Sequence, residues 1–430
     1  VTTHGGMTSH AAVVARGMGK CCVTGCSDVE IDTVNKTVYY PDGELHEGDI
    51  VSVDGSTGDI YLGEIETVNA EHSDAFEQFM EWSEDTARLQ VRMNAETPQD
   101  IQAGYNFGAK GIGLVRTEHM FFGPERLVEM RRFILASNHD ERVEALEKIK
   151  TYQVKDFEEI FRLSQNRPTI VRLLDPPLHE FLPSSDEDIQ NVAQQLDIST
   201  DILRKRMAEL NEVNPMLGHR GCRLAVTYPE LYEMQVEAII ESVLKLQQED
   251  IKCQPEIMIP LVSTVEEFTT LKERLAATIT QLENDANTKV NYLIGTMIET
   301  PRACLIAQHL AKHCDFFSFG TNDLTQLTYG FSRDDAGKFI NVYTESNILQ
   351  LDPFQTLDTD GVGQLIQLAV DQAKQVKPEI KIGVCGELGG DAKSIYQFNK
   401  WNIDYVSCSP FRVPGAILAT AQSQAEESER

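Results

Sequence analysis

The chain has 430 residues, of which 41% are hydrophobic and 24% charged, and its formal net charge is -29 at pH 7. This composition is ordinary for a folded globular protein and argues against a wholly disordered chain. The length predicts two or three domains. The acidic excess argues against non-specific nucleic-acid binding and against anchoring to an anionic membrane, although local arginines could still hold a small anionic substrate.

The sequence shows no apolar run long enough to span a membrane and no signal peptide. We expect a cytoplasmic location and leave an organellar one open. The nine cysteines are odd in number and mostly lie in apolar runs, which predicts reduced, buried thiols. Cys22 and Cys26 lack the paired spacing of a zinc site. The chain begins at Val1 without an initiator Met, close to a chemical motif, so we expect a fragment of a longer protein.

The first 88 residues are typical of a small α/β segment and a linker. Residues 11–16 favour a helix that two glycines would end. Polar residues with aromatic side chains at helical spacing predict a helical linker over 66–88. We therefore assign 1–65 to an incomplete first domain. Four runs separated by turn residues favour short strands: 21–25, 37–40, 50–53 and 60–62.

From residue 89 onward, strand-like and helix-like runs alternate. Such alternation predicts a parallel sheet, and about eight units over roughly 340 residues suit a (β/α)8 barrel. The run 216–223 is a ninth candidate for eight places, which leaves the count open, and 175–211 is typical of an insertion. The eight other strand candidates are Leu89–Asn94, Ile112–Arg116, Thr169–Leu174, Ile257–Leu261, Tyr292–Met297, Phe316–Phe319, Ile380–Val384 and Tyr405–Ser407.

A histidine that follows two glycines is the first chemical motif. His10 precedes a run of small residues that favours a helix, and Thr8 and Ser9 can cap that helix. An anion on His10 would then lie at the positive end of the helix, beside free backbone N–H groups. A capping histidine without chemistry is the alternative. The two glycines and the small-residue helix together favour a covalent phosphoryl carrier.

Polar residues follow several of the barrel-strand candidates. Because a parallel barrel has its active site at the carboxyl ends of its strands, we expect these side chains to share one rim. Glu299 and Asp323 are hard oxygen ligands suited to Mg²⁺. Cys385 is a candidate proton donor, although its spacing alone also fits a buried apolar thiol. The other candidates are Arg116 and Arg172, which can grip phosphate or carboxylate, and Gly320 and Thr321, whose N–H groups can approach a ligand.

Two long motifs resemble the signatures of the PEP-utilising enzymes. The first surrounds His10, from Gly5 to Arg16, and the second runs from Asp315 to Gln326. Two further runs, 173–183 and 218–224, are similar to the pyruvate, phosphate dikinase branch of that family. The resemblance covers nearly the whole chain. It implies an α/β fold in which a partial swivelling β/β/α phosphohistidine domain precedes a phosphoenolpyruvate- and pyruvate-binding (β/α)8 barrel over 89–430.

The resemblance implies a phosphotransferase that interconverts ATP, phosphate and pyruvate with AMP, pyrophosphate and phosphoenolpyruvate. His10 would carry the phosphoryl group, Glu299 and Asp323 would bind Mg²⁺ that stabilises the enolate, and Cys385 would move a proton at the methyl carbon. Thr8 matches a regulatory phosphorylation site of plant relatives, although a helix cap is the simpler role. Substrate contacts would come from Arg116, Arg172, Arg220, Glu299, Gly320, Thr321, Asn322 and Asp323.

The sequence departs from the family pattern in two respects. His4 stands where the family often has arginine, which puts a nearby phosphate contact in doubt. The ATP-binding domain and the start of the phosphohistidine domain are absent, so we expect a partial chain that cannot make phospho-His10 from ATP. The resemblance further implies a homodimer formed through the barrel, with 66–88 as the hinge of the swivelling domain.

Three alternatives stay open beside the dikinase interpretation. A pyruvate, water dikinase and the first enzyme of the sugar phosphotransferase system belong to the same superfamily, but the run 173–183 argues against both. An inactive binding module built on the barrel is the third alternative. The presence of Glu299, Asp323 and Cys385 argues against it.

Overall fold

The computed structural model describes residues 1–3, 21–33, 35–55, 57–66, 74–183 and 185–428. The chain divides into two compact units. One comprises Val1–Phe79 with Ser332–Gln350, and the other comprises Met80–Phe331 with Leu351–Arg430. The division falls inside helix α2 (Asp74–Thr86), within the segment predicted to be a helical linker. The hinge role of that segment stays a prediction.

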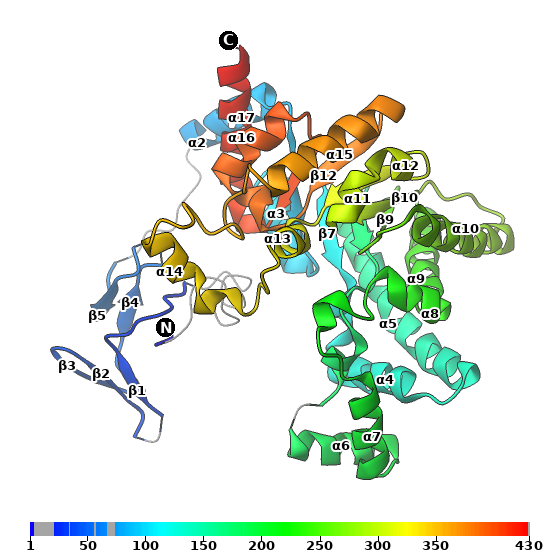
Figure 1. Cartoon of the computed structure of the whole chain (residues 1–430), viewed down its shortest axis with the longest axis horizontal. Helices are drawn as coiled ribbons and strands as arrows, with labels where there is room; N and C mark the ends of the chain where they lie inside the picture. Colours follow the sequence, from blue (N-terminus) through cyan, green and yellow to red (C-terminus); the bar gives the residue numbers. More distant parts are fainter. Residues whose placement is uncertain (4–20, 34, 56, 67–73, 184, 429–430) are drawn as a thin grey trace. The chain divides into compact units, whose positions relative to one another are not determined.

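The first unit contains two small antiparallel sheets (Figure 1). Three strands form one sheet in the order β1-β2-β3, and β4 pairs with β5 in the other. The runs expected at 37–40, 50–53 and 60–62 correspond to β2, β4 and β5, whereas β1 and β3 were not predicted. The elements are β1 (Glu30–Asp32), β2 (Thr37–Tyr40), β3 (Gly43–His46), β4 (Val51–Val53), β5 (Ile60–Leu62), η4 (Ala336–Lys338) and α14 (Ile340–Glu345).

The strand expected at 21–25 is wrong. Two backbone hydrogen bonds join this run to Thr2, from the Thr2 N–H to the Val23 carbonyl (2.9 Å) and from the Cys26 N–H to the Thr2 carbonyl (3.0 Å). Gly25 then turns the backbone with a φ of 73°. Among the described residues, 21–25 belong to no strand. The helix expected over 11–16 lies outside the described residues.

The second unit contains a closed barrel of eight parallel strands, β6 to β13 in chain order around the ring. All eight barrel-strand candidates are confirmed, with ends that shift by up to three residues. The α/β barrel fold is therefore also confirmed. The strands are β6 (Gln90–Asn94), β7 (Ile112–Arg116), β8 (Pro168–Arg172), β9 (Gln254–Ile259), β10 (Leu293–Ile298), β11 (Phe316–Phe319), β12 (Lys381–Val384) and β13 (Tyr405–Cys408).

Helices follow the strands and lie around them (Figure 1). No helix in the described parts of the chain is both long enough and apolar enough to cross a membrane. The α-helices of this unit are α3 (Pro98–Asn106), α4 (Pro124–Leu135), α5 (His139–Ser164), α6 (Asp186–Leu196), α7 (Thr200–Leu210), α8 (Cys222–Thr227), α9 (Pro229–Gln247), α10 (Val265–Ala286), α11 (Pro301–Leu305), α12 (Ala307–Ala311), α13 (Thr321–Tyr329), α15 (Val362–Val376), α16 (Ala392–Lys400) and α17 (Val413–Ser428).

The ninth strand candidate, 216–223, is wrong. The chain there forms a 3-10 turn, η3 (Pro215–Leu217), and then the start of α8. Gly221 has a φ of 56°, which an extended strand does not allow, and its N–H donates to the Asp175 carbonyl (2.9 Å). The segment therefore turns back toward the end of β8. The insertion at 175–211 contains η2 (Leu178–Phe181), α6 and α7, with no strand in its described residues.

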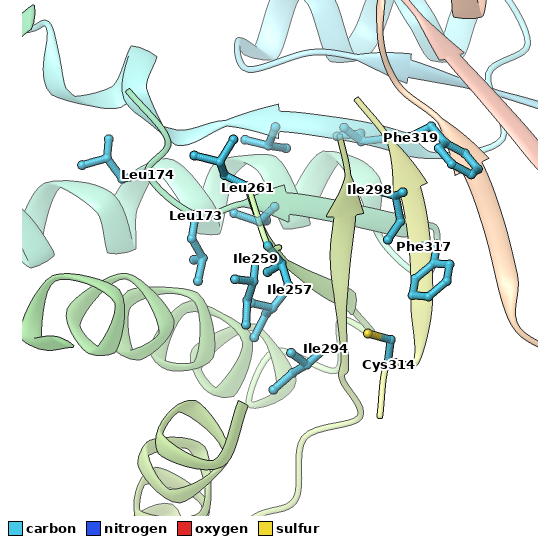
Figure 2. Packing of buried hydrophobic residues seen from close by; sticks show 14 of the residues in the cluster. Leu173, Leu174, Ile257, Ile259, Leu261, Ile294, Ile298, Cys314, Phe317 and Phe319 are labelled. Carbon is cyan, nitrogen blue, oxygen red and sulfur yellow. The ribbon is translucent and has the colours of Figure 1, made fainter. Parts of the chain in front are cut away.

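The barrel has one apolar core outside the strands and another inside them. The outer core fills the space between strands and helices, and Figure 2 shows Ile257 and Ile259 of β9 and Ile294 of β10 directed toward neighbouring helices. Full burial of such a side chain contributes about 1.5–3 kcal/mol. The inner core draws residues from seven strands or the position just beyond them: Leu114, Ile170, Met258, Met297, Phe316, Cys385 and Tyr405.

Candidate active site

The carboxyl ends of the barrel strands bring the expected side chains to one rim. Arg116 ends β7 and Arg172 ends β8, and these two residues are register partners in neighbouring strands. Glu299 directly follows β10, Gly320 follows β11, and Cys385 follows β12. All strands of a parallel barrel run the same way, so these five residues lie at the same end of the barrel.

Two arginines and their carboxylate partners form a continuous ion-pair network at this rim. The Asp175 Oδ2 atom lies 3.2 Å from Arg172 Nη1 and 2.6 Å from Arg220 Nη2. The second Arg220 nitrogen, Nη1, donates to Asp323 Oδ1 at 2.9 Å. Arg172 also pairs with Glu118, just beyond β7. Arg172 and Arg220 are thus held from several sides and are preorganised for an anionic ligand.

Mutual neutralisation keeps the members of this network charged. Burial would raise the pKa of Asp175, but the guanidinium groups of Arg172 and Arg220 lower that pKa below its ordinary value. Burial would also lower the pKa of each arginine, whereas the facing carboxylates raise it. Asp175 is therefore ionised and both arginines are cationic throughout the physiological pH range.

Glu299 has one satisfied and one unsatisfied carboxylate oxygen. Its Oε1 atom accepts the Leu261 N–H at 2.6 Å, while its Oε2 atom is buried without a hydrogen-bond partner in the described residues. Burial raises the pKa of Glu299 well above its usual range, and the negative charges of Asp323 and Asp175 raise it further. A Cβ atom at position 320 would lie 2.5 Å from the free oxygen, so the close approach of the backbone to that oxygen requires Gly320.

The chemistry of Glu299 and Asp323 fits a divalent cation. A buried carboxylate without a partner is costly, and a cation beside it would remove that cost. Mg²⁺ commonly binds through one or two carboxylates and takes its remaining ligands from water and substrate. The described residues contain no group of three or more His, Cys, Asp or Glu side chains arranged as a metal site. Glu299 and Asp323 provide two carboxylates of the kind that such a cation uses.

Cys385 is a buried, protonated thiol. Its Sγ atom lies 3.6 Å from the Phe319 carbonyl oxygen, to which the thiol donates. Burial raises the pKa of Cys385, and the nearby Ser318 hydroxyl and the charge of Arg172 only partly counter that effect. The thiol form therefore predominates at neutral pH. A thiol held in this state at the rim can supply a proton to a bound ligand.

Gly320 links β11 to α13, and residues 321–323 form the first turn of that helix. Thr321 is buried at the start of that helix, and its Oγ1 atom has no hydrogen-bond partner in the described part of the chain. A Cβ atom at position 386 would lie 1.9 Å from this hydroxyl, so Gly386 allows the ends of β11 and β12 to approach closely. Asn322 and Asp323 are partly exposed and are accessible to a ligand.

Arg116 is the most exposed of the three arginines, at 29% of its side chain, and Glu96 holds it in place. The Arg116 backbone N–H and its guanidinium group both donate to Glu96 Oε1, at 3.2 and 3.3 Å. Burial would raise the pKa of Glu96, but a hydrogen bond from His119 and the charge of Arg116 lower it. This pair supports the outer edge of the rim.

The sequence analysis did not identify the carboxylates that hold the arginines. Glu96, Glu118 and Asp175 each lie within three residues of the end of a barrel strand. These carboxylates could have been predicted from their position, because acidic residues that closely follow barrel strands can pair with arginines at the same rim. The hydroxyls of Ser318 and Tyr405 near Cys385 were also missed, because both lie inside strands that appear simply apolar.

The predicted phosphoryl carrier, His10, lies outside the described residues, as do Thr8 and His4. The structure therefore brings together the barrel residues of the expected site, Arg116, Arg172, Arg220, Glu299, Gly320, Thr321, Asn322, Asp323 and Cys385. The role of His10 rests on its sequence motif alone.

Two family descriptions match the chain. The "PEP-utilising enzyme, PEP-binding domain" matches residues 70–425, and the "PEP-utilising enzyme, mobile domain" matches residues 1–58. The chain is 48% identical over 424 residues to a pyruvate, phosphate dikinase of Clostridium symbiosum. The matched residues are 98% of this chain and 48% of that protein. The chain is 49% identical over 424 residues to a protein of the same name from Rhizobium meliloti (strain 1021), with 98% and 47% covered.

A plant relative matches the chain with similar identity and coverage. Pyruvate, phosphate dikinase 1, chloroplastic, from Arabidopsis thaliana is 48% identical over 424 residues, which are 98% of this chain and 44% of the plant protein. The chain thus spans about half the length of the curated relatives that it matches.

Proposed function

Because the chain belongs to the PEP-utilising enzyme family, as its sequence motifs indicated, we propose that it performs the phosphoenolpyruvate half of a pyruvate, phosphate dikinase reaction. In this half-reaction a phosphoryl group moves between phosphoenolpyruvate and His10. The observation that carries the proposal is the rim where Arg172, Arg220, Glu299 and Asp323 converge beside the protonated thiol of Cys385. No described residue is assigned to the ATP and phosphate half.

The arginines are proposed to bind the anionic groups of the substrate. Arg172 and Arg220 are fixed by Asp175, so they can meet a phosphoryl or carboxylate group without first losing conformational freedom. Arg116 faces the open side of the rim and is proposed to complete the phosphoryl site as charge spreads over the transferring oxygens. The backbone of Gly320 and Thr321 and the amide of Asn322 are proposed to line the pocket.

Glu299 and Asp323 are proposed to hold Mg²⁺, which when bound neutralises charge on the substrate oxygen as the enolate forms. The free Glu299 Oε2 atom supports this role. Four carboxylates, Glu96, Glu118, Asp175 and Asp323, already face the three arginines. Ionisation of a fifth, Glu299, therefore needs an additional cation.

In the direction of pyruvate formation, we expect phosphoryl transfer to His10 to come first and proton transfer from Cys385 to follow. The bond between phosphorus and the enol oxygen breaks, its electron pair stays on that oxygen, and a bond forms between phosphorus and a ring nitrogen of His10. The Cys385 thiol then donates its proton to the methylene carbon of the enolate, and solvent later reprotonates the thiolate. In the opposite direction, the thiolate removes a methyl proton from pyruvate.

Three features of the proposal rest on family membership alone. Homodimer formation, a cytoplasmic or organellar location, and regulation at Thr8 are predictions that need separate tests. For Thr8, the simpler role of a helix cap is retained.

The metal and substrate site is tested by calorimetric titration of the chain with oxalate, a mimic of the enolate. We expect oxalate to bind in the presence of Mg²⁺ and Glu299→Gln to weaken that binding at least about tenfold, which is 1.4 kcal/mol. Glu283→Gln is the control, because Glu283 is also a buried carboxylate but pairs with Lys289 and accepts the Val290 N–H near the end of α10. Oxalate binding that does not depend on Mg²⁺, or no binding, would favour the inactive binding module.

The dikinase assignment is tested with the full-length protein. We expect phosphate-dependent release of pyrophosphate when ATP and pyruvate are supplied. His10→Ala is expected to lose both half-reactions but to retain proton exchange at the pyruvate methyl group, because the barrel residues suffice for that exchange. Formation of AMP without pyrophosphate would indicate a pyruvate, water dikinase. Phosphorylation by phosphoenolpyruvate without any nucleotide reaction would indicate the phosphotransferase-system enzyme.

A further inference from the structure

The interior of the barrel contains an ion pair where branched aliphatic side chains usually dominate. Seven of the eight strands contribute apolar residues, Cys385 or Tyr405 to the inner core. The eighth, β6, contributes Arg92, whose Nη1 donates to Glu256 Oε2 of β9 at 3.0 Å. The two side chains are 6% and 12% exposed. This is a buried charge pair that links two strands, β6 and β9, that are not neighbours in the barrel.

Stability alone is a weak explanation for this pair. Removing two charges from water can cost more than their attraction returns, and apolar residues of similar volume are often as stable or more stable. The Arg92 Nε atom also has no hydrogen-bond partner in the described residues, which adds to the cost.

Arg92 lies against the ring of Tyr405. Its Cζ atom is 4.0 Å from the ring centroid, a distance typical of a cation–π contact. The ring also packs on Gly383, where a Cβ atom would come within 1.9–2.3 Å of three ring atoms. The Tyr405 hydroxyl has no hydrogen-bond partner of normal geometry in the described residues. Packing by Arg92 and Gly383, rather than hydrogen bonding, therefore sets the position of this ring.

The Tyr405 ring and the Cys385 thiol share one polar environment. Both belong to the inner core, and Ser318 of β11 lies near both of them. Burial raises the pKa of each group, and the Ser318 hydroxyl counters the rise in both. A shift of the Tyr405 ring would therefore change the surroundings of the thiol.

We infer that Arg92, held by Glu256, is a positioning residue for proton transfer: it fixes the Tyr405 ring beside Ser318 and thereby the environment of the Cys385 thiol. Arg92 does not touch the substrate in this proposal. The inference rests on the proposed function of Cys385, and it assigns a role to a charge pair inside the barrel, below the residues that would bind substrate.

The test compares proton transfer with ligand binding in two variants. Arg92→Lys keeps the charge and the ion pair but loses the planar group that stacks on the ring. The double variant Arg92→Met, Glu256→Leu removes both charges together and leaves none unpaired. We expect deuterium exchange into the pyruvate methyl group, followed by NMR with Mg²⁺ present, to fall about tenfold in Arg92→Lys and further in the double variant. Oxalate affinity should stay within about twofold of wild type.

A matched control is available on the outside of the barrel. Arg142 of α5 pairs with Glu230 of α9 and lies over the ring of Tyr228, with its Cζ atom 5.2 Å from the centroid. The variant Arg142→Met, Glu230→Leu removes the same three-part arrangement far from Cys385 in sequence and on the helical layer. Its exchange rate should equal that of wild type.

Wild-type exchange in Arg92→Lys, or a loss of exchange that merely parallels a loss of oxalate affinity, would overturn the inference. If the double variant does not fold, Arg92→Lys still decides, because it keeps the ion pair. If the wild-type chain neither exchanges the methyl protons nor binds oxalate, the proposed function fails and the inference fails with it. Exchange by wild type together with unaltered exchange by Arg92→Lys rejects the inference alone.

Discussion

Replacement of Cys385 by alanine is expected to abolish proton exchange at the methyl group of pyruvate, with a loss of at least about a thousandfold. The thiol is the proton donor of the proposed reaction, and burial keeps it protonated until the enolate needs the proton. The measurement is deuterium incorporation into pyruvate, followed by NMR. Phosphorylation of His10 from the nucleotide side in the full-length enzyme should be intact, because that step does not use the barrel rim.

Cys304→Ala is the control for the loss of a buried thiol. Cys304 lies on α11 and is as fully buried as Cys385, but it is not at the end of a strand. Its exchange rate should match that of wild type. An exchange rate in Cys385→Ala equal to that of wild type would refute the assigned role.

Replacement of Asp175 by alanine is expected to destabilise the protein by about 3–5 kcal/mol. Asp175 neutralises Arg172 and Arg220, which are both buried, so its loss leaves two cations facing each other with fewer partners. Denaturant titration gives the change in the free energy of unfolding. Asp186→Ala is the control, because its ion pair with Arg204 is exposed and should contribute no more than about 1 kcal/mol.

The destabilisation should depend on pH in a defined direction. The pKa of Asp175 is lowered in the folded protein, so its stabilising contribution is complete above the unfolded value of about 3.9 and is lost as the pH falls through the folded value. The difference between wild type and Asp175→Ala should therefore be largest near neutral pH and shrink in acid. A difference that is small at neutral pH would show that the two arginines find other partners.

The strands of the barrel were predictable because parallel strands covered by helices are buried on both faces and form short apolar runs. Their ends were less predictable. The predicted run of β9 continues to Leu261, but the strand ends at Ile259. Pro260 has no N–H to donate to the ladder, and Leu261 takes a φ of 60° and donates its N–H to Glu299, a residue 38 positions further along the chain.

The number of barrel strands was also not predictable from the local sequence pattern. The run at 216–223 was a candidate for a place in the barrel, and the 3-10 turn at its start together with the turn at Gly221 excludes it. That turn is stabilised by the Asp175 carbonyl, which comes from the end of another strand. Local sequence pattern cannot report a hydrogen bond between two segments that meet only after folding.

Most of the charged groups of the barrel site, and its thiol, were recognisable from sequence, since each follows an apolar strand and the fold places such positions on one rim. Arg220 was indicated only by the family resemblance. The ion-pair partners that hold these groups in place were not recognisable from the sequence. Asp175 bridges to Arg220 over 45 positions, Arg220 to Asp323 over 103, and Arg92 to Glu256 over 164. Residue type and the alternation of strand-like and helix-like runs thus predicted the barrel and most chemical groups of the site, and the resemblance of two long motifs indicated the family. The ion pairs that fix those groups, the free oxygen of Glu299 and the support beneath Cys385 depend on distances that exist only once the barrel has closed.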